Sequence, residues 1–164
     1  MPKEKLVFNI KEINRETWRY FSKYHYLNEN LPGGKLHLYG LFYENNQIGF
    51  QCFANYVPNS KNRIKIYHSN RTVIHPDYQG LGLGIKFITE TSKLLKQKHN
   101  YKILAKFSNE VIYKSMIKNK YWKLLKIERK LNKISKGRKM IRNTGFREKG
   151  IKCYYFQFIN NIND

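Results

Sequence analysis

The chain has 164 residues, of which 41% are hydrophobic and 15% aromatic, enough for one folded domain with a core. No run of eighteen apolar residues occurs, so no membrane-spanning helix is expected, and two cysteines are too few for a disulfide scaffold or a zinc site. The 32 Lys and Arg stand against 11 Asp and Glu, for a net charge of +21. This charge predicts a polyanionic partner, DNA or RNA, with a solvated basic surface or a lysine-rich codon bias as the alternatives.

Apolar alternation, helical spacing and turn residues predict the secondary structure in chain order. The expected elements are a strand at 6–13, a helix that begins after Asn14, a hairpin of strands at 36–43 and 47–57, a strand at 66–75, a helix at 85–98, a strand at 101–107, a helix from 109 to about 118 and a last strand at 153–159. No internal repeat divides this order, so residues 1–164 are expected to form a single α/β (α+β) domain. Two thiols and no apolar export signal favour a reduced, cytoplasmic protein.

A glycine-rich turn, residues 79–84, joins the strand at 66–75 to the helix at 85–98. A strand that feeds such a turn at a helix N-terminus predicts an anion site, because free N–H groups and the helix dipole attract phosphate and glycine lets it approach. A Walker loop is excluded because Lys86 is followed by Phe87 instead of Ser or Thr. The glycines at 80, 82 and 84 also do not match the G-x-G-x-x-G spacing of dinucleotide-binding loops.

What remains is Q-x-x-G-x-G, formed by Gln79, Gly82 and Gly84. This motif resembles the acyl-CoA pyrophosphate loop of the GNAT acyltransferase superfamily, and residues 71–78 resemble the strand and turn before it. The resemblance covers most of the chain. It implies the single-domain GNAT fold, a mixed and mostly antiparallel twisted sheet with helices on both faces. It also implies that acetyl-CoA, or another acyl-CoA, lies between strands that splay apart.

The resemblance places the splay between residues 70–75 and 101–107 and assigns cofactor contacts along it. Backbone amides of Val73 and Ile74 would polarise the thioester carbonyl, and the amides of the loop would hold the pyrophosphate. The expected cofactor-binding residues are Val73, Ile74, Gln79, Gly80, Leu81, Gly82, Leu83, Gly84 and Asn109.

The proton-handling residues depart from the usual GNAT pattern. Many GNATs place a Tyr seven residues after an Asn that opens a helix; Asn109 fits the Asn, but position 116 is Met, so Tyr113 is the alternative acid. The strand before the loop has no Glu, which leaves His68 and His25 as candidate bases. The alternative is that all three are ordinary core or surface residues.

Three segments support a more specific resemblance within the superfamily: Tyr24-His25-Tyr26-Leu27, the run from Arg71 into the glycine loop, and residues 108–122. Together they are similar to an atypical GNAT branch of phages and mobile elements, which includes the Mom type of DNA-base modifiers.

Residues 118–143 hold eleven Lys or Arg and one acid, Glu128, a net of +10. Apolar residues spaced 3, 4, 3 from Leu124 predict an amphipathic helix with a lysine stripe beside the seam. This basic helical arm is expected either to hold phosphates or to be a solvated face; membrane binding is disfavoured, because the apolar side lacks Trp and Phe. The expected nucleic-acid contacts are Lys123, Lys126, Lys130, Lys133, Arg138, Lys139 and Arg142.

The sequence thus predicts an acyl-CoA-dependent N-acyltransferase whose acceptor is a nucleobase, an aminoacyl-tRNA amine or a lysine of a nucleic-acid-bound protein. A non-catalytic GNAT-fold module that binds nucleic acid is the first alternative. A small-molecule amine acetyltransferase is the second, disfavoured because a basic chain repels a cationic amine.

Overall fold

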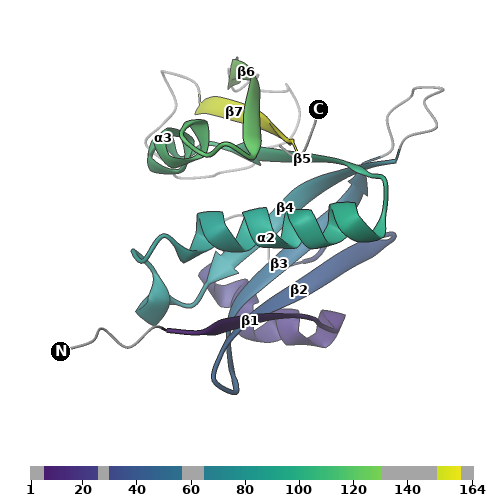
Figure 1. Ribbon diagram of the computed structural model, residues 1–164, viewed down its shortest axis with the longest axis vertical. Coiled ribbons are helices and arrows are strands. Elements are labelled where there is room, and N and C mark those ends of the chain that lie inside the picture. The colour runs from purple at the N-terminus through teal and green to yellow at the C-terminus, as the bar shows by residue number, and fades with distance from the viewer. Residues whose placement is uncertain (1–5, 26–29, 57–64, 131–150, 160–164) are drawn as a thin grey trace, which may run out of the picture.

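The computed structural model describes residues 6–25, 30–56, 65–130 and 151–159, which form one seven-stranded sheet flanked by helices (Figure 1). The sheet order is β1-β2-β3-β4-β5-β7-β6, and only the β4–β5 pair is parallel. The elements are β1 Phe8–Glu12, α1 Trp18–Phe21, β2 Leu36–Tyr43, β3 Asn46–Tyr56, β4 Ile66–Ile74, α2 Leu83–Lys98, β5 Lys102–Phe107, α3 Glu110–Ile117, β6 Trp122–Lys130 and β7 Ile151–Phe158, with short 3₁₀ turns at Arg15–Thr17, Ser22–Tyr24 and Pro76–Tyr78.

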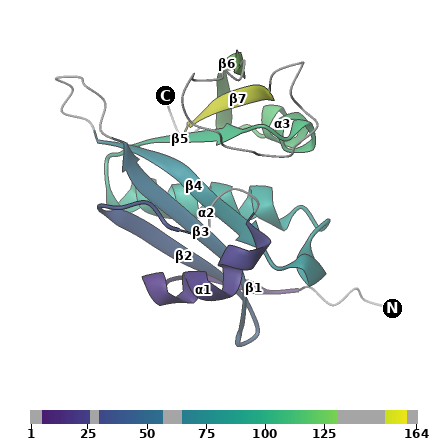
Figure 2. The same cartoon turned by 180° about the vertical axis from the view of Figure 1, so that it is seen from behind.

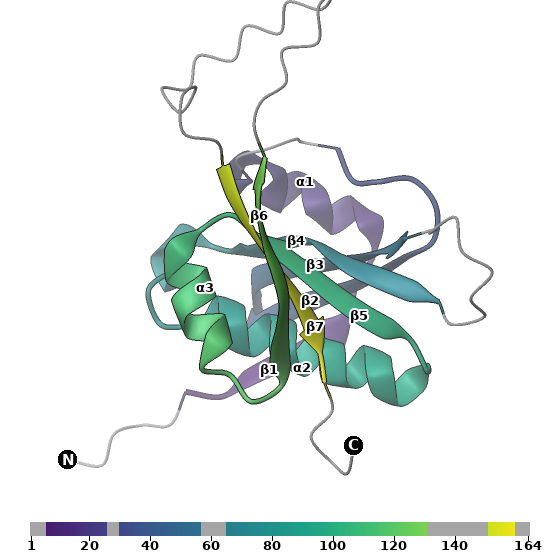
Figure 3. The same ribbon diagram turned by 90° about the horizontal axis from the view of Figure 1, so that it is seen from above.

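Helices cover both faces of the sheet, which confirms the predicted mixed sheet and its flanking helices (Figures 2 and 3). On one face α2 and α3 bury the larger core, in which Phe87 and Leu95 of α2 meet Tyr67 of β4 and Met116 of α3. On the other face α1 buries a smaller core, in which Trp18 and Phe21 lie against Phe50, Cys52 and Val73. Strands β2, β3 and β4 therefore send side chains into both cores.

The prediction of a helical arm over residues 118–143 is wrong for residues 122–130, which form strand β6 and pair antiparallel with β7. Leu124 lies opposite Phe156 and Lys126 opposite Tyr155, so Leu125 is the extra residue of a β-bulge. The bulge adds one residue to the alternation, and Leu124 and Ile127 therefore share a face at a spacing of three. A helix gives the same spacing, which explains the error. The rest of the arm, Leu131 to Asn143, lies outside the described residues.

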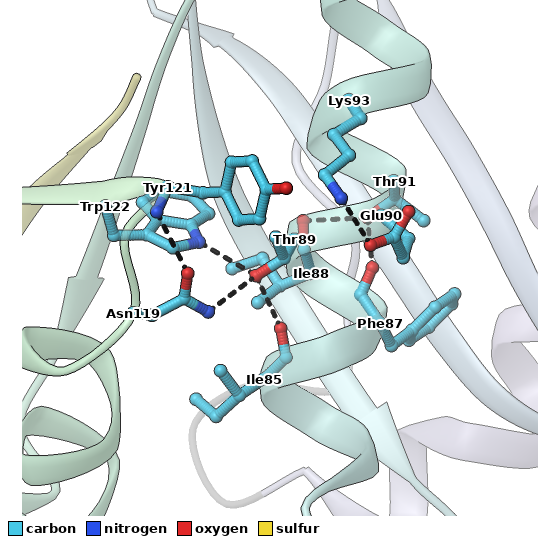
Figure 4. Close-up of polar contacts among 10 residues, drawn as sticks. All are labelled: Ile85, Phe87, Ile88, Thr89, Glu90, Thr91, Lys93, Asn119, Tyr121 and Trp122. Atoms are coloured by element: carbon cyan, nitrogen blue, oxygen red, sulfur yellow. Dashed lines mark hydrogen bonds and ion pairs between the residues drawn. The ribbon is translucent and has the colours of Figure 1, made fainter. Parts of the chain in front are cut away.

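A buried threonine on α2 ties the two halves of the sheet together (Figure 4). The hydroxyl of Thr89 donates to the carbonyl of Ile85 (2.7 Å) and accepts from the indole N–H of Trp122 (2.9 Å) and the amide of Asn119 (3.3 Å). One hydroxyl thus uses its donor and both lone pairs. Because Trp122 opens β6 and Thr89 lies on α2, this contact fixes α2 relative to the β5–β7–β6 half.

In the described part of the chain, no helix combines the length and hydrophobicity needed to cross a bilayer.

Candidate functional site

The two central parallel strands separate partway along the sheet. Pairing of β4 with β5 runs from Ile66 opposite Lys102 to Ser69 opposite Ala105 and then stops, although β4 continues to Ile74. On its other edge β5 pairs with β7 from Leu104 to Phe107, and the β5–β7–β6 half turns away from the β1–β4 half (Figure 1). Residues 70–74 of β4 thus have one edge without a neighbour among the described strands.

A β-bulge marks the point of separation. Ser69 lies opposite Phe53 and Arg71 opposite Cys52, so Asn70 is the extra residue. Past the bulge, the His75 N–H donates to Ile48 of β3 (2.8 Å), and by alternation the Thr72 and Ile74 N–H groups point away from β3, toward the gap. The alternation directs the Val73 N–H toward β3, so the geometry favours Thr72 and Ile74 as backbone donors at the gap.

The glycine loop leads from the end of β4 to the N-terminus of α2. Gly80 (φ 82°) and Gly82 (φ 70°) adopt left-handed conformations that favour glycine, and Gly82 is the N-cap residue. No described side chain caps α2, so the N–H groups of its first turn remain available to a ligand. The Gln79 side-chain amide donates to the Ile74 carbonyl (2.8 Å) and thereby fastens the loop to β4. Leu81 and Leu83 complete the loop, the former exposed and the latter buried.

The α3 residues lie on the same side of the sheet as the loop. The Asn109 side-chain oxygen caps α3 by accepting from the Val111 (2.8 Å) and Ile112 (3.2 Å) N–H groups. One turn later the Tyr113 ring stacks on Tyr154 of β7, with centroids 4.2 Å apart. Asn109 therefore positions the helix that carries Tyr113.

The two histidines lie on the opposite side of the sheet. His25 follows the Ser22–Tyr24 turn and meets the edge of Trp18, with ring centroids 5.9 Å apart. His68 alternates with buried Tyr67 on β4 and so faces away from α2. Burial lowers the pKa of both imidazoles; nearby Arg71 lowers that of His25 further, and Lys106 that of His68. Both are therefore neutral at pH 7 and able to accept a proton.

The structure thus places the three catalytic candidates on two sides of the splayed strands instead of in one cluster. Tyr113 shares its side with the glycine loop, whereas His25 and His68 share theirs with α1. In the described ranges, no group of three or more His, Cys, Asp and Glu could hold a metal ion. Burial raises the pKa of the Cys52 thiol to about 12, so it is not a thiolate nucleophile at neutral pH.

Sequence reasoning missed the polar residues around the bulge. Gln51 is fully buried on β3 and is hydrogen-bonded to Ser69 and Thr72 of β4. The Arg71 guanidinium bonds the Asn30 carbonyl (3.2 Å) and the Asn70 side chain (2.8 Å), fastening the bulge to the segment after α1. One signal was available, a glutamine within the apolar run Phe50 to Phe53.

Three lysines and a tyrosine form what we call the basic face: Lys106, Lys123, Lys126 and Tyr155. Lys106 and Lys126 lie opposite Tyr155 on its two neighbouring strands, with ammonium groups 5.4 and 4.8 Å from the ring centroid. No described helix covers this side of β5, β7 and β6 (Figure 2). Lys126 also pairs with Glu128. Two lysines of the predicted stripe thus share a face, although on a strand; Lys130 ends β6, and Lys133, Arg138, Lys139 and Arg142 lie outside the described residues.

Comparison with solved structures identifies this architecture as the GNAT fold. An Arabidopsis thaliana NAA60 in complex with a bisubstrate analogue superposes with a TM-score of 0.64 at 12% identity, over 94% of this chain and 100% of that one. The ribosomal-protein-S18-alanine N-acetyltransferase from Escherichia coli gives 0.60 at 12%, over 96% and 99%. A GNAT family acetyltransferase from Elizabethkingia anophelis with acetyl-CoA bound gives 0.56 at 13%, over 93% and 98%. No protein-family profile and no curated protein sequence matches the chain.

Proposed function

We propose that this protein is a cytoplasmic acyl-CoA-dependent N-acyltransferase, with acetyl-CoA as the acyl donor. The observation that carries the proposal is the uncapped N-terminus of α2, which opens on a glycine loop beside the gap between β4 and β5. An anion site next to an unpaired strand edge suits a ligand with a pyrophosphate at one end and an extended amide-bearing arm at the other. Structures with the same fold hold acetyl-CoA or CoA.

The reaction joins an amine nitrogen to the thioester carbonyl carbon and breaks the carbon–sulfur bond. The Thr72 and Ile74 N–H groups, which point toward the gap, stabilise the negative charge that develops on the carbonyl oxygen. His68 or His25 takes the proton that the amine loses, since both are neutral at pH 7. Tyr113 returns a proton to the leaving thiolate from the side of the glycine loop.

The two-sided placement of these residues supports this division of roles. The cofactor occupies the side of α2 and α3, and the acceptor enters from the side of α1. The acid and the base then act on different partners from opposite sides of the gap, with no need for contact between them.

We further propose that the acceptor is a nucleic acid or a protein bound to one. The basic face supports this, because it lies on the acceptor side and combines ammonium groups with the aromatic ring of Tyr155. Lysines neutralise phosphates and a tyrosine face stacks on bases. The sequence resemblance to Mom-type modifiers adds a nucleobase to the acceptors worth testing.

Titration of the protein with CoA and acetyl-CoA in a calorimeter tests the proposed cofactor, and absence of binding refutes it. Incubation with labelled acetyl-CoA plus tRNA, DNA and protein fractions then shows which fraction takes the label. Binding without label transfer to any fraction would favour a non-catalytic GNAT-fold module.

The basic face is tested by changing Lys106 and Lys126 to Gln. Affinity for the labelled nucleic acid should fall, and the slope of log affinity against log salt should flatten by about 0.7–0.9 for each phosphate that the variant no longer neutralises. Changing Lys11 and Lys118 to Gln removes the same charge elsewhere and should leave that slope nearly unchanged. Equal effects of the two pairs would assign the affinity to overall charge instead of this face.

A further inference from the structure

A hydrogen-bonded ring of one buried and two half-buried side chains lies at the point where β4 and β5 separate. Gln51 of β3 has no exposed surface and stands among apolar neighbours such as Phe50 and Phe53. A buried amide is costly unless its hydrogen bonds are satisfied, so its partners indicate why a polar residue stands there. Its two side-chain partners, Ser69 and Thr72, belong to β4, and its amide nitrogen also donates to the Cys52 carbonyl (3.2 Å).

The ring closes through three side chains. The Thr72 hydroxyl donates to the Gln51 side-chain oxygen (2.6 Å), and the Gln51 amide nitrogen donates to the Ser69 hydroxyl oxygen (3.0 Å). The two hydroxyls are 3.2 Å apart. Because the Thr72 proton is used on Gln51, Ser69 must donate to Thr72, and the three bonds run in one direction. Such rings polarise each bond and fail as a unit when one member is lost.

The ring spans the bulge. Ser69 precedes Asn70 and is the last β4 residue paired with β5, whereas Thr72 follows the bulge and lies opposite Gln51. A bulge disrupts the ladder hydrogen bonds on its strand, so the backbone there depends on side chains to hold its register. The ring supplies that constraint at the residue whose N–H points toward the gap.

We propose that Gln51, Ser69 and Thr72 are positioning residues, which hold the bulge so that the Thr72 N–H meets the acyl carbonyl oxygen. This role rests on the proposed acyltransferase function. The ring acts on the acyl group alone, because the pyrophosphate is bound by the first turn of α2, which the ring does not touch. It therefore governs discrimination of acetyl-CoA from CoA and the rate of acyl transfer, and leaves CoA affinity unaffected.

The test changes Thr72 to Val, which removes the hydroxyl and keeps a β-branched side chain, and to Ser, which restores a hydroxyl. The matched control is Thr91→Val, since Thr91 is a buried threonine whose hydroxyl donates to the Phe87 carbonyl within α2 (2.7 Å) and takes no part in the ring. Calorimetry measures CoA and acetyl-CoA affinity, single-turnover kinetics measure acyl transfer, and amide hydrogen exchange reports on residues 71–73.

Thr72→Val should lower the rate of acyl transfer about 10²-fold, as expected when an oxyanion donor is displaced. The variant should also lose the preference for acetyl-CoA over CoA and keep CoA affinity within about twofold. The Val73 amide, which points toward β3, should exchange about tenfold faster. Thr72→Ser should recover most of the rate, and Thr91→Val should change none of these quantities. A Thr72→Val protein with unchanged rate and unchanged preference overturns the positioning role alone. A wild-type protein that binds neither CoA nor acetyl-CoA overturns the proposed function and, with it, this role.

Discussion

A carboxylate at Gly84 should weaken cofactor binding while making the protein slightly more stable. Gly84 lies in the first turn of α2, and a Cβ there would meet only the Ile74 side chain at 3.9 Å, an ordinary contact. Replacing a helical glycine gains about 0.5–1 kcal/mol in unfolding free energy, and an acidic residue in the first turn gains about 0.3–1 kcal/mol from the helix dipole. Part of this gain is offset by the weaker helix propensity of Asp.

The same carboxylate opposes the pyrophosphate. At a separation of about 5 Å, each pair of negative charges costs about 1–3 kcal/mol, depending on how much water screens it. CoA affinity should therefore fall about 10- to 100-fold in Gly84→Asp. Gly84→Ala adds the Cβ without the charge, should gain similar stability and should keep CoA affinity.

Calorimetric titration with CoA and urea unfolding of the three proteins measure both quantities. Loss of binding in the Ala variant would mean that space, and not charge, decides the effect. Undiminished affinity in the Asp variant would refute the placement of the pyrophosphate at this helix.

Three further outcomes follow from the site. If His68 is the base, log kcat/KM should rise with pH up to the pKa of His68 and be constant above it, and burial holds that pKa below 6.5. His68→Ala should lower the rate about 10²–10⁴-fold and remove this inflection from the pH profile. Tyr113→Phe keeps the stack on Tyr154 and should slow acyl transfer with CoA affinity unchanged; an unaltered rate would assign the thiolate proton to water. Thr89→Val leaves the Trp122 indole N–H buried without its acceptor and should lower the unfolding free energy by about 1–3 kcal/mol in urea titration, whereas an unchanged midpoint would show that the contact is dispensable.

Histidine protonation also sets the sign of the pH dependence of stability. The pKa values of His25 and His68 are lower in the folded than in the unfolded chain, so the unfolded state binds protons first as the pH falls. Their contribution to stability is complete above pH 6.5 and declines as the pH falls below it.

Local patterns predicted most of the fold. The turn Glu44 to Asn46 predicted the hairpin of β2 and β3, and the glycines and the apolar stripe of α2 predicted the loop and its helix. These signals are short-range and depend on backbone preferences of few residues. The motif at 79–84 also predicted a glycine turn at a helix N-terminus, which the left-handed Gly80 and the Gly82 N-cap confirm, and the proposed anion site rests on that turn.

Two β-bulges explain the features that could not be predicted from the sequence. The bulge at Leu125 gave the apolar residues of β6 the spacing of a helix. The bulge at Asn70 placed the Thr72 N–H at the gap, and no sequence motif indicates that position. A bulge is decided by pairing with a distant strand, which local composition does not encode. The ring likewise joins Gln51 to Ser69 and Thr72, which lie eighteen and twenty-one positions further along the chain on a neighbouring strand.

The position of β7 has a consequence for how the chain is made. β7 lies between β5 and β6, although it follows both of them in the chain and is the last of the described strands. Until residues 151–158 leave the ribosome, β5 has one unpaired edge and β6 has no partner at all among the described strands. Open edges of this kind promote pairing with other chains, so the nascent protein is most prone to aggregation in the interval before β7 is made. We expect a premature stop near residue 150 to yield an insoluble product, although every element that lines the glycine loop is already present.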